Sequence, residues 1–222
     1  MIVRKVEPIT LVGGGEVSDS ALGRAMGVAP FVVAADGGAD RVLARGVMPE
    51  AVIGDFDSIS AGARDKIPEN NQHVIAEQDS TDFEKCLRNI EAPLIVGVGF
   101  CGARLDHQLA ACNALVRNAS RRCVLLGQND LVFLAPPSVS LNLAADTSVS
   151  LFPMGAVEGV SDGLKWPIAG LNFAPDGGIG TSNRATGPVQ LTVTAPKLLV
   201  LLPLDTLDDV MRALLETPAG WD

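Results

Sequence analysis

The chain has 222 residues, a formal net charge of −9, a hydrophobic content of 47% and a mean hydropathy of +0.28. No apolar stretch approaches the roughly 20 residues that a membrane-spanning helix needs, so we expect a soluble protein without a membrane partner. A chain this acidic, with no local basic stripe, repels a nucleic-acid backbone, so nucleic acid is not an expected partner either.

The cysteines and the N-terminus indicate the compartment. Cys86, Cys101, Cys112 and Cys123 form no C-x-x-C pair, and the chain has only two histidines. A zinc site is therefore not expected, and reduced, mostly buried thiols are. Met1–Lys5 lacks the apolar run of a secretory signal, so the sequence predicts a cytoplasmic protein.

The first part of the chain alternates between two kinds of segment. Short apolar runs, several rich in Val and Ile, are typical of parallel strands: Ile9–Val12, Phe31–Ala35, Ala51–Ile53, His73–Ile75, Leu94–Val98 and Cys123–Leu126. Between them, apolar residues recur at helical spacing in Asp19–Met26, Ala39–Arg45, Thr81–Ile90 and Leu105–Asn118, and Ser80 or Thr81 can cap the third. This βαβα alternation predicts an α/β domain with a mostly parallel sheet over residues 1–135.

The pattern changes after Pro136 and Pro137. Short alternating runs, separated by Gly, Pro, Asn and Asp, follow at Val139–Leu143, Val149–Phe152, Gly170–Phe173, Val189–Val193 and Leu198–Leu202. Such spacing predicts an all-β, sandwich-like domain over residues 138–222. Thr206–Leu215 has two acids in its first turn and predicts a short helical tail at the end of that domain.

Acidic residues concentrate in three short segments that follow predicted strands. These are Asp36-Gly37-Gly38-Ala39-Asp40, Gly54-Asp55-Phe56-Asp57-Ser58 and Gln78-Asp79-Ser80-Thr81-Asp82. Parallel strands end at one edge of the sheet, which is where open α/β sheets bind ligands. Because crowded like charges repel one another unless a cation holds them, the segments predict a divalent metal, Mg²⁺, carrying a polyphosphate.

Each acid also has a purely structural alternative. Asp36 precedes a helix and can act as a cap. Asp55 and Asp57 stand at i and i+2, so in an extended segment both carboxylates face one cation, although an Asx-turn is the competing interpretation. Asp79 and Asp82 stand at a helix start, where acids commonly balance the helix dipole. The coincidence of all three segments favours the metal site.

Two glycine-bearing loops are candidates for phosphate contact. Gly13–Gly15 follows the first strand, but it matches neither a dinucleotide fingerprint nor a P-loop, and a tight turn is the simpler interpretation. In Gly99–His107 a strand leads into a helix whose first turn carries Arg104 and His107. A guanidinium offers two parallel donors to phosphate oxygens, so Arg104 is the natural phosphate partner, while His107 can contact phosphate or base.

Trp166 is the most informative residue of the second part. The chain has two tryptophans and no tyrosine, and Trp166 stands beside Lys165 and Pro167. A tryptophan in such a loop is a candidate stacking platform for a flat ring. The ordinary alternative is a core tryptophan.

Taken together in order and spacing, these motifs closely resemble thiamine pyrophosphokinase. The resemblance spans about residues 9 to 202 and rests on the three acidic segments with Arg104-Leu105-Asp106-His107, Gly163-Leu164-Lys165-Trp166 and Thr181-Ser182-Asn183. Members have an α/β nucleotide-binding domain followed by a β-sandwich and act as homodimers with each active site between subunits. They transfer a pyrophosphoryl group from ATP to the hydroxyl of thiamine, release AMP and use Mg²⁺.

The resemblance implies a role for each matching residue. Mg²⁺ ligands would be Asp36, Asp55, Asp57 and Asp82. Residues carrying the chemistry would be Asp55, Asp57, Asp82 and Arg104, and nucleotide would contact Asp36, Gly37, Gln78, Arg104, Asp106 and His107. Thiamine would be held by Trp166, Thr181, Ser182 and Asn183 of the partner subunit.

Four positions depart from the family pattern, namely Asp40, Ala103, Ala111 and Gly180, and they affect the expected fine contacts to nucleotide and thiamine. Two other functions remain open from the sequence. One is another Mg²⁺-dependent phospho- or pyrophosphotransferase acting on a heterocyclic alcohol. The other is a non-catalytic sensor of nucleotide or thiamine, which would not need so many carboxylates.

Overall fold

The computed structural model describes residues 1–102, 104–217 and 220–221. They form two compact units: unit 1 comprises Met1–Ala114 with Leu125–Gln128, and unit 2 comprises Leu115–Val124 with Asn129–Asp222. The chain therefore enters unit 2, returns briefly to unit 1 and then completes unit 2. No helix among the described residues is long and apolar enough to cross a membrane.

Unit 1 is built on a parallel sheet. Five strands pair in the order β7-β2-β3-β4-β5: β2 (Ile9–Val12), β3 (Phe31–Ala35), β4 (Ala51–Gly54), β5 (Gln72–Val74) and β7 (Ile95–Val98). Leu125 and Leu126 of β8 (Cys123–Leu126) lie beside β7, and β1 (Val3–Arg4) pairs separately with β6 (Ile90–Glu91). Every residue of β2, β4 and β7 is buried, which is why these strands are apolar runs without alternation. The predicted parallel pairing is confirmed.

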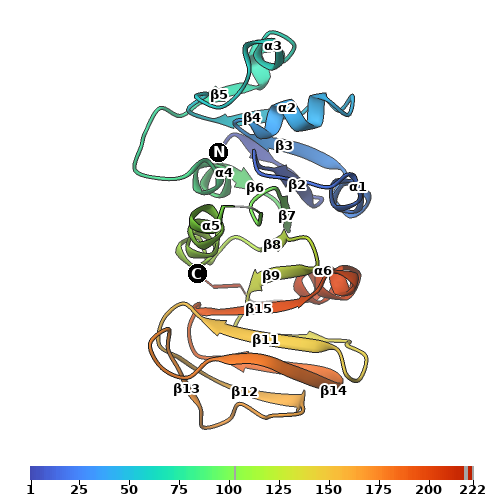
Figure 1. Cartoon of the computed structure of the whole chain (residues 1–222), viewed down its shortest axis with the longest axis vertical. Helices are drawn as coiled ribbons and strands as arrows, with labels where there is room; N and C mark the ends of the chain where they lie inside the picture. Colours follow the sequence, from blue (N-terminus) through green and yellow to red (C-terminus); the bar gives the residue numbers. More distant parts are fainter. Residues whose placement is uncertain (103, 218–219, 222) are drawn as a thin grey trace. The chain divides into compact units, whose positions relative to one another are not determined.

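Helices connect the strands of unit 1. They are α1 (Asp19–Val28), α2 (Gly38–Leu43), α3 (Ala61–Arg64), the 3₁₀ turn η1 (Glu69–Asn71), α4 (Asp82–Asn89) and α5 (Leu105–Arg117), which runs on into unit 2. In Figure 1, α1 and α4 lie on opposite sides of the sheet. The side chain of Thr81 caps α4 by accepting a hydrogen bond from the backbone N–H of Glu84. The sequence did not predict α3, which Ser60 caps in the same way.

Unit 2 contains antiparallel strands. They are β9 (Asp130–Leu134), β10 (Ser138–Leu141), β11 (Ser148–Pro153), β12 (Val157–Leu164), β13 (Asn172–Phe173), β14 (Gly180–Val193) and β15 (Leu198–Pro203). Residues 190–192 of β14 pair with both β10 and β12, whereas residues 183–184 pair with β11, so one long strand serves two sets of neighbours. The predicted antiparallel pairing is confirmed. β12 was not predicted, and the run at Gly170–Phe173 forms only the short strand β13.

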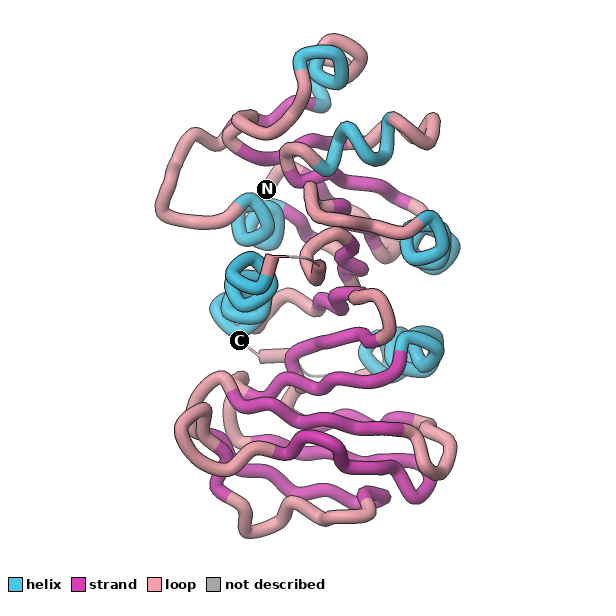
Figure 2. The backbone as a smooth tube through the Cα atoms, viewed as in Figure 1, coloured by secondary structure: helices cyan, strands magenta, loops and turns pink. Residues whose placement is uncertain are grey.

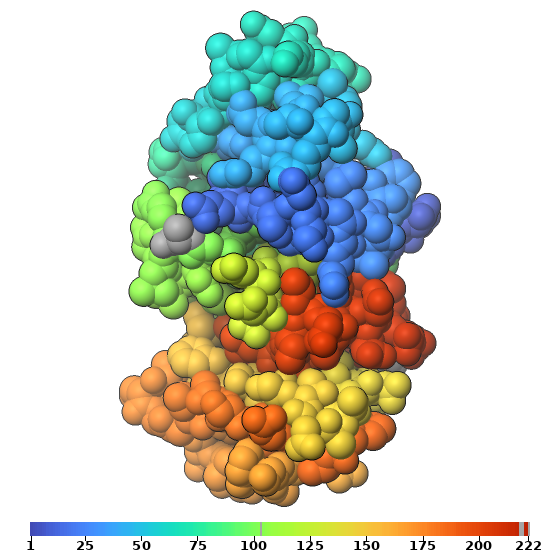
Figure 3. All heavy atoms as spheres, turned by 45° about the vertical axis from the view of Figure 1, so that its right-hand side comes forward, coloured from blue at the N-terminus to red at the C-terminus, as the bar shows by residue number. Residues whose placement is uncertain are grey.

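The helical tail is part of the core of unit 2. After the turn η2 (Leu204–Thr206), α6 (Leu207–Glu216) buries five residues, Leu207, Val210, Met211, Ala213 and Leu214, and packs against β10. The other face of α6 forms surface, red in Figure 3. Beyond it, the indole N–H of Trp221 donates to the carbonyl of Ala135. The predicted helix at Thr206–Leu215 is confirmed, one residue later at each end.

Candidate active site

A cleft of about 1020 Å³ opens at the carboxyl ends of the strands of unit 1. Many residues predicted to act on nucleotide or metal line it: Asp36, Gly37, Asp55, Gln78, Asp82, Arg104 and His107. The strands deliver them there because β3, β4 and β7 each end directly before one of the motifs. The cleft is large enough for a nucleotide.

Asp36 is the buried centre of the acid cluster. Its side chain is 2% exposed, and its backbone has a φ of 40°, a conformation that non-glycine residues rarely adopt. Its two carboxylate oxygens accept hydrogen bonds from the backbone N–H groups of Ser58 (3.1 Å) and Ile59 (3.0 Å). Burial raises the pKa of Asp36 to about 6. The negative charge of Asp82 raises this pKa further, whereas the hydrogen bonds from the two backbone N–H groups lower it.

Asp55 and Asp57 lie close to Asp36, but the backbone between them has a conformation that the sequence did not predict. The segment between them is not extended, because Phe56 has a φ of 66°, so the argument from i and i+2 alternation is wrong. The turn nevertheless brings one carboxylate oxygen from each of Asp36, Asp55 and Asp57 to within 4.8 Å of one another. Three carboxylates at this spacing, one of them buried, suit a hard divalent cation with oxygen ligands.

Lys85 is a site residue that the sequence analysis missed. It lies on α4, is 1% exposed, and its Nζ donates to Asp82 Oδ1 (3.0 Å) and Asp55 Oδ2 (3.2 Å). Burial would lower its pKa, but the hydrogen bonds to the two carboxylates outweigh burial and raise it, so Lys85 carries a positive charge. The available signal was its position three residues after Asp82, on the same helix face. Because Asp82 is paired with Lys85, its role as a metal ligand stays a prediction.

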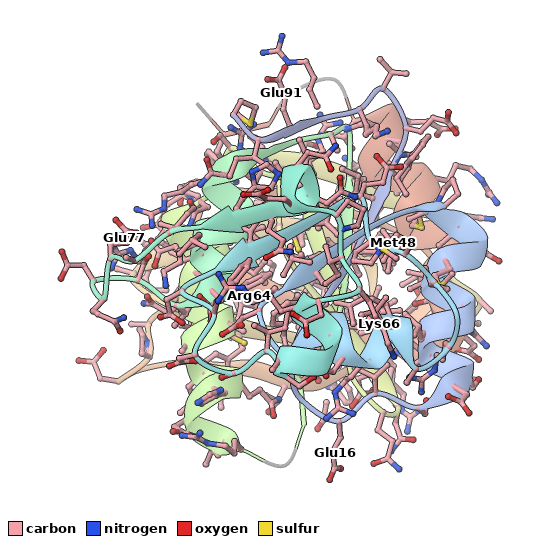
Figure 4. The ribbon with its side chains drawn as sticks, turned by 90° about the horizontal axis from the view of Figure 1, so that it is seen from above. Glu16, Met48, Arg64, Lys66, Glu77 and Glu91 are labelled. Atoms are coloured by element: carbon pink, nitrogen blue, oxygen red, sulfur yellow. The ribbon has the colours of Figure 1, made fainter. Side chains whose placement is uncertain are left out.

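The loop between β5 and α4, visible in Figure 2, forms one wall of the cleft. Gln78 Nε2 donates to Asp55 Oδ2 (3.1 Å) from this loop. Arg88 of α4 reaches back to it, donating to Ser80 Oγ (2.6 Å) and forming an ion pair with Glu77, which stands on the outside of the ribbon in Figure 4. The loop that carries Gln78 is thus tied to the helix that carries Lys85.

Gly15 acts in packing rather than as a phosphate donor. Its N–H donates to the carbonyl of Gly99 (3.1 Å), and any side chain there would collide with that carbonyl. Arg41 stabilises the same loop, because its Nε and Nη2 both donate hydrogen bonds to the carbonyl oxygen of Gly14 (3.0 and 2.9 Å). The tight-turn interpretation therefore suits Gly13–Gly15.

Arg104 and His107 line the cleft, and Arg104 already has a partner. Its Nε and Nη2 donate to the two carboxylate oxygens of Asp106 (3.2 and 2.6 Å). Both side chains are about two-thirds exposed, at 67% and 66%, so this pair is weak and exchangeable. Arg104 can therefore leave Asp106 for an anion in the cleft.

The positions that depart from the family pattern lie in different structural environments. Asp40 accepts hydrogen bonds from the N–H (2.9 Å) and the hydroxyl of Ser60, which joins α2 to the start of α3. Ala111 is buried and lines the cleft. Gly180 begins β14, where a side chain would press on Leu151. Ala103 lies outside the described residues.

The predicted thiamine residues belong to unit 2. Trp166 is 53% exposed, with Lys165 Nζ 4.9 Å from its ring centroid, so it is not a core tryptophan. Asn183 is buried: its Nδ2 donates to the carbonyl of Trp166 (2.7 Å), and its Oδ1 accepts from the N–H of Trp166 (3.2 Å). Asn183 therefore positions the Trp166 loop. Thr181 and Ser182 are exposed, and Ser182 has a φ of 64°.

Comparison with known proteins agrees in both halves of the chain. The family model "Thiamin pyrophosphokinase, catalytic domain" matches residues 22–126, and "Thiamin pyrophosphokinase, vitamin B1 binding domain" matches residues 138–198. Thiamine pyrophosphokinase 3 of Oryza sativa subsp. japonica is 28% identical over 185 residues, covering 68% of this chain and 69% of that protein. Thiamine pyrophosphokinase 2 of Arabidopsis thaliana is 29% identical over 183 residues, covering 67% and 68%.

A solved structure has the same fold. The thiamin pyrophosphokinase of Geobacillus thermodenitrificans superposes with a TM-score of 0.72 at 23% identity, covering 88% of this chain and 96% of that one. The two family models together account for most of the chain, in the order that the family has them. The chain belongs to the thiamin pyrophosphokinase family.

Proposed function

We propose that this chain is a thiamine diphosphokinase, which transfers the pyrophosphoryl group of ATP to the hydroxyl of thiamine with Mg²⁺ and releases AMP. The observation that carries the proposal is the approach of one carboxylate oxygen from each of Asp36, Asp55 and Asp57 to within 4.8 Å of one another. Of the three, Asp36 and Asp55 line the nucleotide-sized cleft. Family membership supplies the substrates. A sensor that only binds these ligands would not need three carboxylates that repel one another.

In this proposal, different residues of the site bind the metal, stabilise charge and position the nucleotide. Bound Mg²⁺ would neutralise charge on the polyphosphate, and Asp36, Asp55 and Asp57 would hold it, with Asp82 nearby. Arg104 would exchange Asp106 for phosphate oxygens and stabilise the charge that develops as AMP leaves. Such catalysis is electrostatic and needs no covalent enzyme intermediate. Gly37, Gln78, Asp106 and His107 are the further residues that we propose to position the nucleotide.

We propose residues 1–135 as the nucleotide- and Mg²⁺-binding domain and residues 138–222 as the thiamine-binding and dimerisation domain. Trp166 would stack on a ring of thiamine, since its side chain is half exposed. Thr181 and Ser182 would add polar contacts, and Asn183 would hold the Trp166 loop. In this proposal the enzyme is a cytoplasmic homodimer whose thiamine residues come from the partner subunit, and it binds neither nucleic acid nor membrane.

Binding of Mg²⁺ should weaken in mild acid. Asp36 is protonated below its pKa of about 6, and a protonated carboxyl cannot serve as a metal ligand. Affinity is therefore fully present above this pKa and is lost as the pH falls through it. We expect the Kd for Mg²⁺ to rise about tenfold between about pH 7.5 and about pH 5 in calorimetric titrations of the nucleotide-free protein. A pH-independent Kd over this range would contradict the participation of Asp36.

The position of attack determines the products. Attack by the thiamine hydroxyl on the β-phosphorus of ATP releases AMP and carries both the β- and the γ-phosphate to thiamine. We expect purified protein, Mg-ATP and thiamine to give AMP and doubly phosphorylated thiamine in equal amounts, with label from either phosphate in the product. Formation of ADP with singly phosphorylated thiamine would indicate a simple kinase, and turnover only with another alcohol would change the substrate.

A further inference from the structure

Lys85 is the most deeply buried charged residue among those that the structure describes. It is 1% exposed and is among the largest fully buried side chains, whereas lysines are almost never fully buried unless they are paired. Its two partners, Asp55 and Asp82, both belong to the acidic segments of the cleft. The ammonium group is therefore a permanent positive charge within the acid cluster.

The carboxylate of Asp55 belongs both to the ion pair with Lys85 and to the group of three carboxylates. Its Oδ2 accepts from Lys85 Nζ at 3.2 Å, and one oxygen of the same carboxylate belongs to the group that also contains Asp36 and Asp57 within 4.8 Å. A divalent cation at that group would lie close to the ammonium. Because like charges this close repel strongly in a partly buried site, the two cations oppose each other's binding to Asp55.

We propose that Lys85 is a positioning residue that substitutes for a metal: it holds Asp55 and Asp82 together when no metal is bound, and it weakens metal binding by competing for Asp55. This inference rests on the metal site of the proposed function. Lys85 thus stabilises the cluster when no metal is bound. Removing its charge should have two opposite effects, a less stable metal-free protein and a tighter metal site.

The test compares wild type, Lys85→Met and Lys85→Gln, the last keeping hydrogen-bond donors without the charge. Lys5→Met is the matched control, because Lys5 forms an ion pair with Glu50 and is only partly exposed but does not line the cleft. Thermal unfolding with and without Mg²⁺ and calorimetric Kd values for Mg²⁺ are measured without nucleotide. In both Lys85 variants we expect a lower Tm without Mg²⁺, a larger rise in Tm on its addition and a Kd at least about tenfold lower than wild type. The control should show none of these changes in metal response.

The outcomes separate this inference from the proposed function. If wild type binds Mg²⁺ but a folded Lys85→Gln protein binds it equally or more weakly, Lys85 does not compete with the metal and the inference is overturned. If wild type binds no divalent cation, both with and without nucleotide, the metal site of the proposed function fails and this inference fails with it. If Lys85→Met does not fold even with Mg²⁺, the Lys85→Gln comparison decides.

Discussion

Replacing Asp57 by Asn should lower turnover by at least about 100-fold and leave stability unchanged, because one of the three proposed ligands to the proposed Mg²⁺ loses its charge. Asp57 is exposed and accepts a hydrogen bond from the hydroxyl of Ser58 (2.7 Å), which an amide oxygen can also accept. Asp55→Asn should lose activity to a similar extent. Steady-state kinetics at saturating Mg-ATP and thermal unfolding without Mg²⁺ check both expectations.

Asp79→Asn is the matched control for this prediction. Asp79 lies on the same loop as Gln78, is exposed and neither lines the cleft nor joins the group of three carboxylates. It should keep activity within a factor of about two, as surface substitutions usually do. Near-normal activity in Asp57→Asn, or an equal loss in Asp79→Asn, would contradict the assignment of the metal site.

The Asp55→Asn variant separates the effect on stability from the effect on activity. In the wild type, the carboxylate of Asp55 is also a partner of buried Lys85. Burial alone would raise the pKa of Asp55, but hydrogen bonds from Lys85, Asp57 N–H and Gln78 lower it. The folded state therefore favours ionised Asp55. We expect Asp55→Asn to unfold at a lower temperature than Asp57→Asn at neutral pH, since Lys85 then loses one of the two carboxylates with which it forms ion pairs.

The sequence predicted those features that depend on local pattern. Continuous apolar runs marked β2, β3, β4 and β7 because strands buried on both faces need no alternation. Since parallel strands end at one edge, the positions of the acids after them placed the cleft. By contrast, β12 was missed because its burial alternates weakly and its sequence holds Glu158, Ser161 and Asp162, which are typical of a loop.

The site could be predicted only in part, since two of its determinants are tertiary. A lysine on a short helix normally lies in solvent, whereas Lys85 is buried and pairs with Asp55, from another element, as well as with Asp82 of its own helix. The positive φ angles of Asp36 and Phe56 likewise follow from the packing of the loop after β4 against Asp36. Strain of this kind is concentrated at functional sites and has no signature in a single sequence.

Mixing two inactive variants should restore activity if the active site is shared between subunits. In the proposed dimer each site takes its acids from one chain and Trp166 from the other. Asp57→Asn alone and Trp166→Ala alone should each be nearly inactive. In a mixed dimer one site carries both changes and the other carries neither. With random exchange half of the dimers are mixed, so activity should rise toward about a quarter of wild type.

The measurement is the rate of AMP formation before and after subunit exchange, with exchange itself demonstrated by a mass or affinity tag on one variant. Mixing Asp57→Asn with Asp55→Asn is the matched control, because both substitutions affect the same half of the shared site. Each active site of a mixed dimer then carries one of the two substitutions. That mixture should show no recovery. If Asp57→Asn and Trp166→Ala also fail to recover despite exchange, each site is built within a single chain or Trp166 does not contact substrate. Because Trp166 is half exposed and Asn183 is committed to holding its loop, we expect recovery.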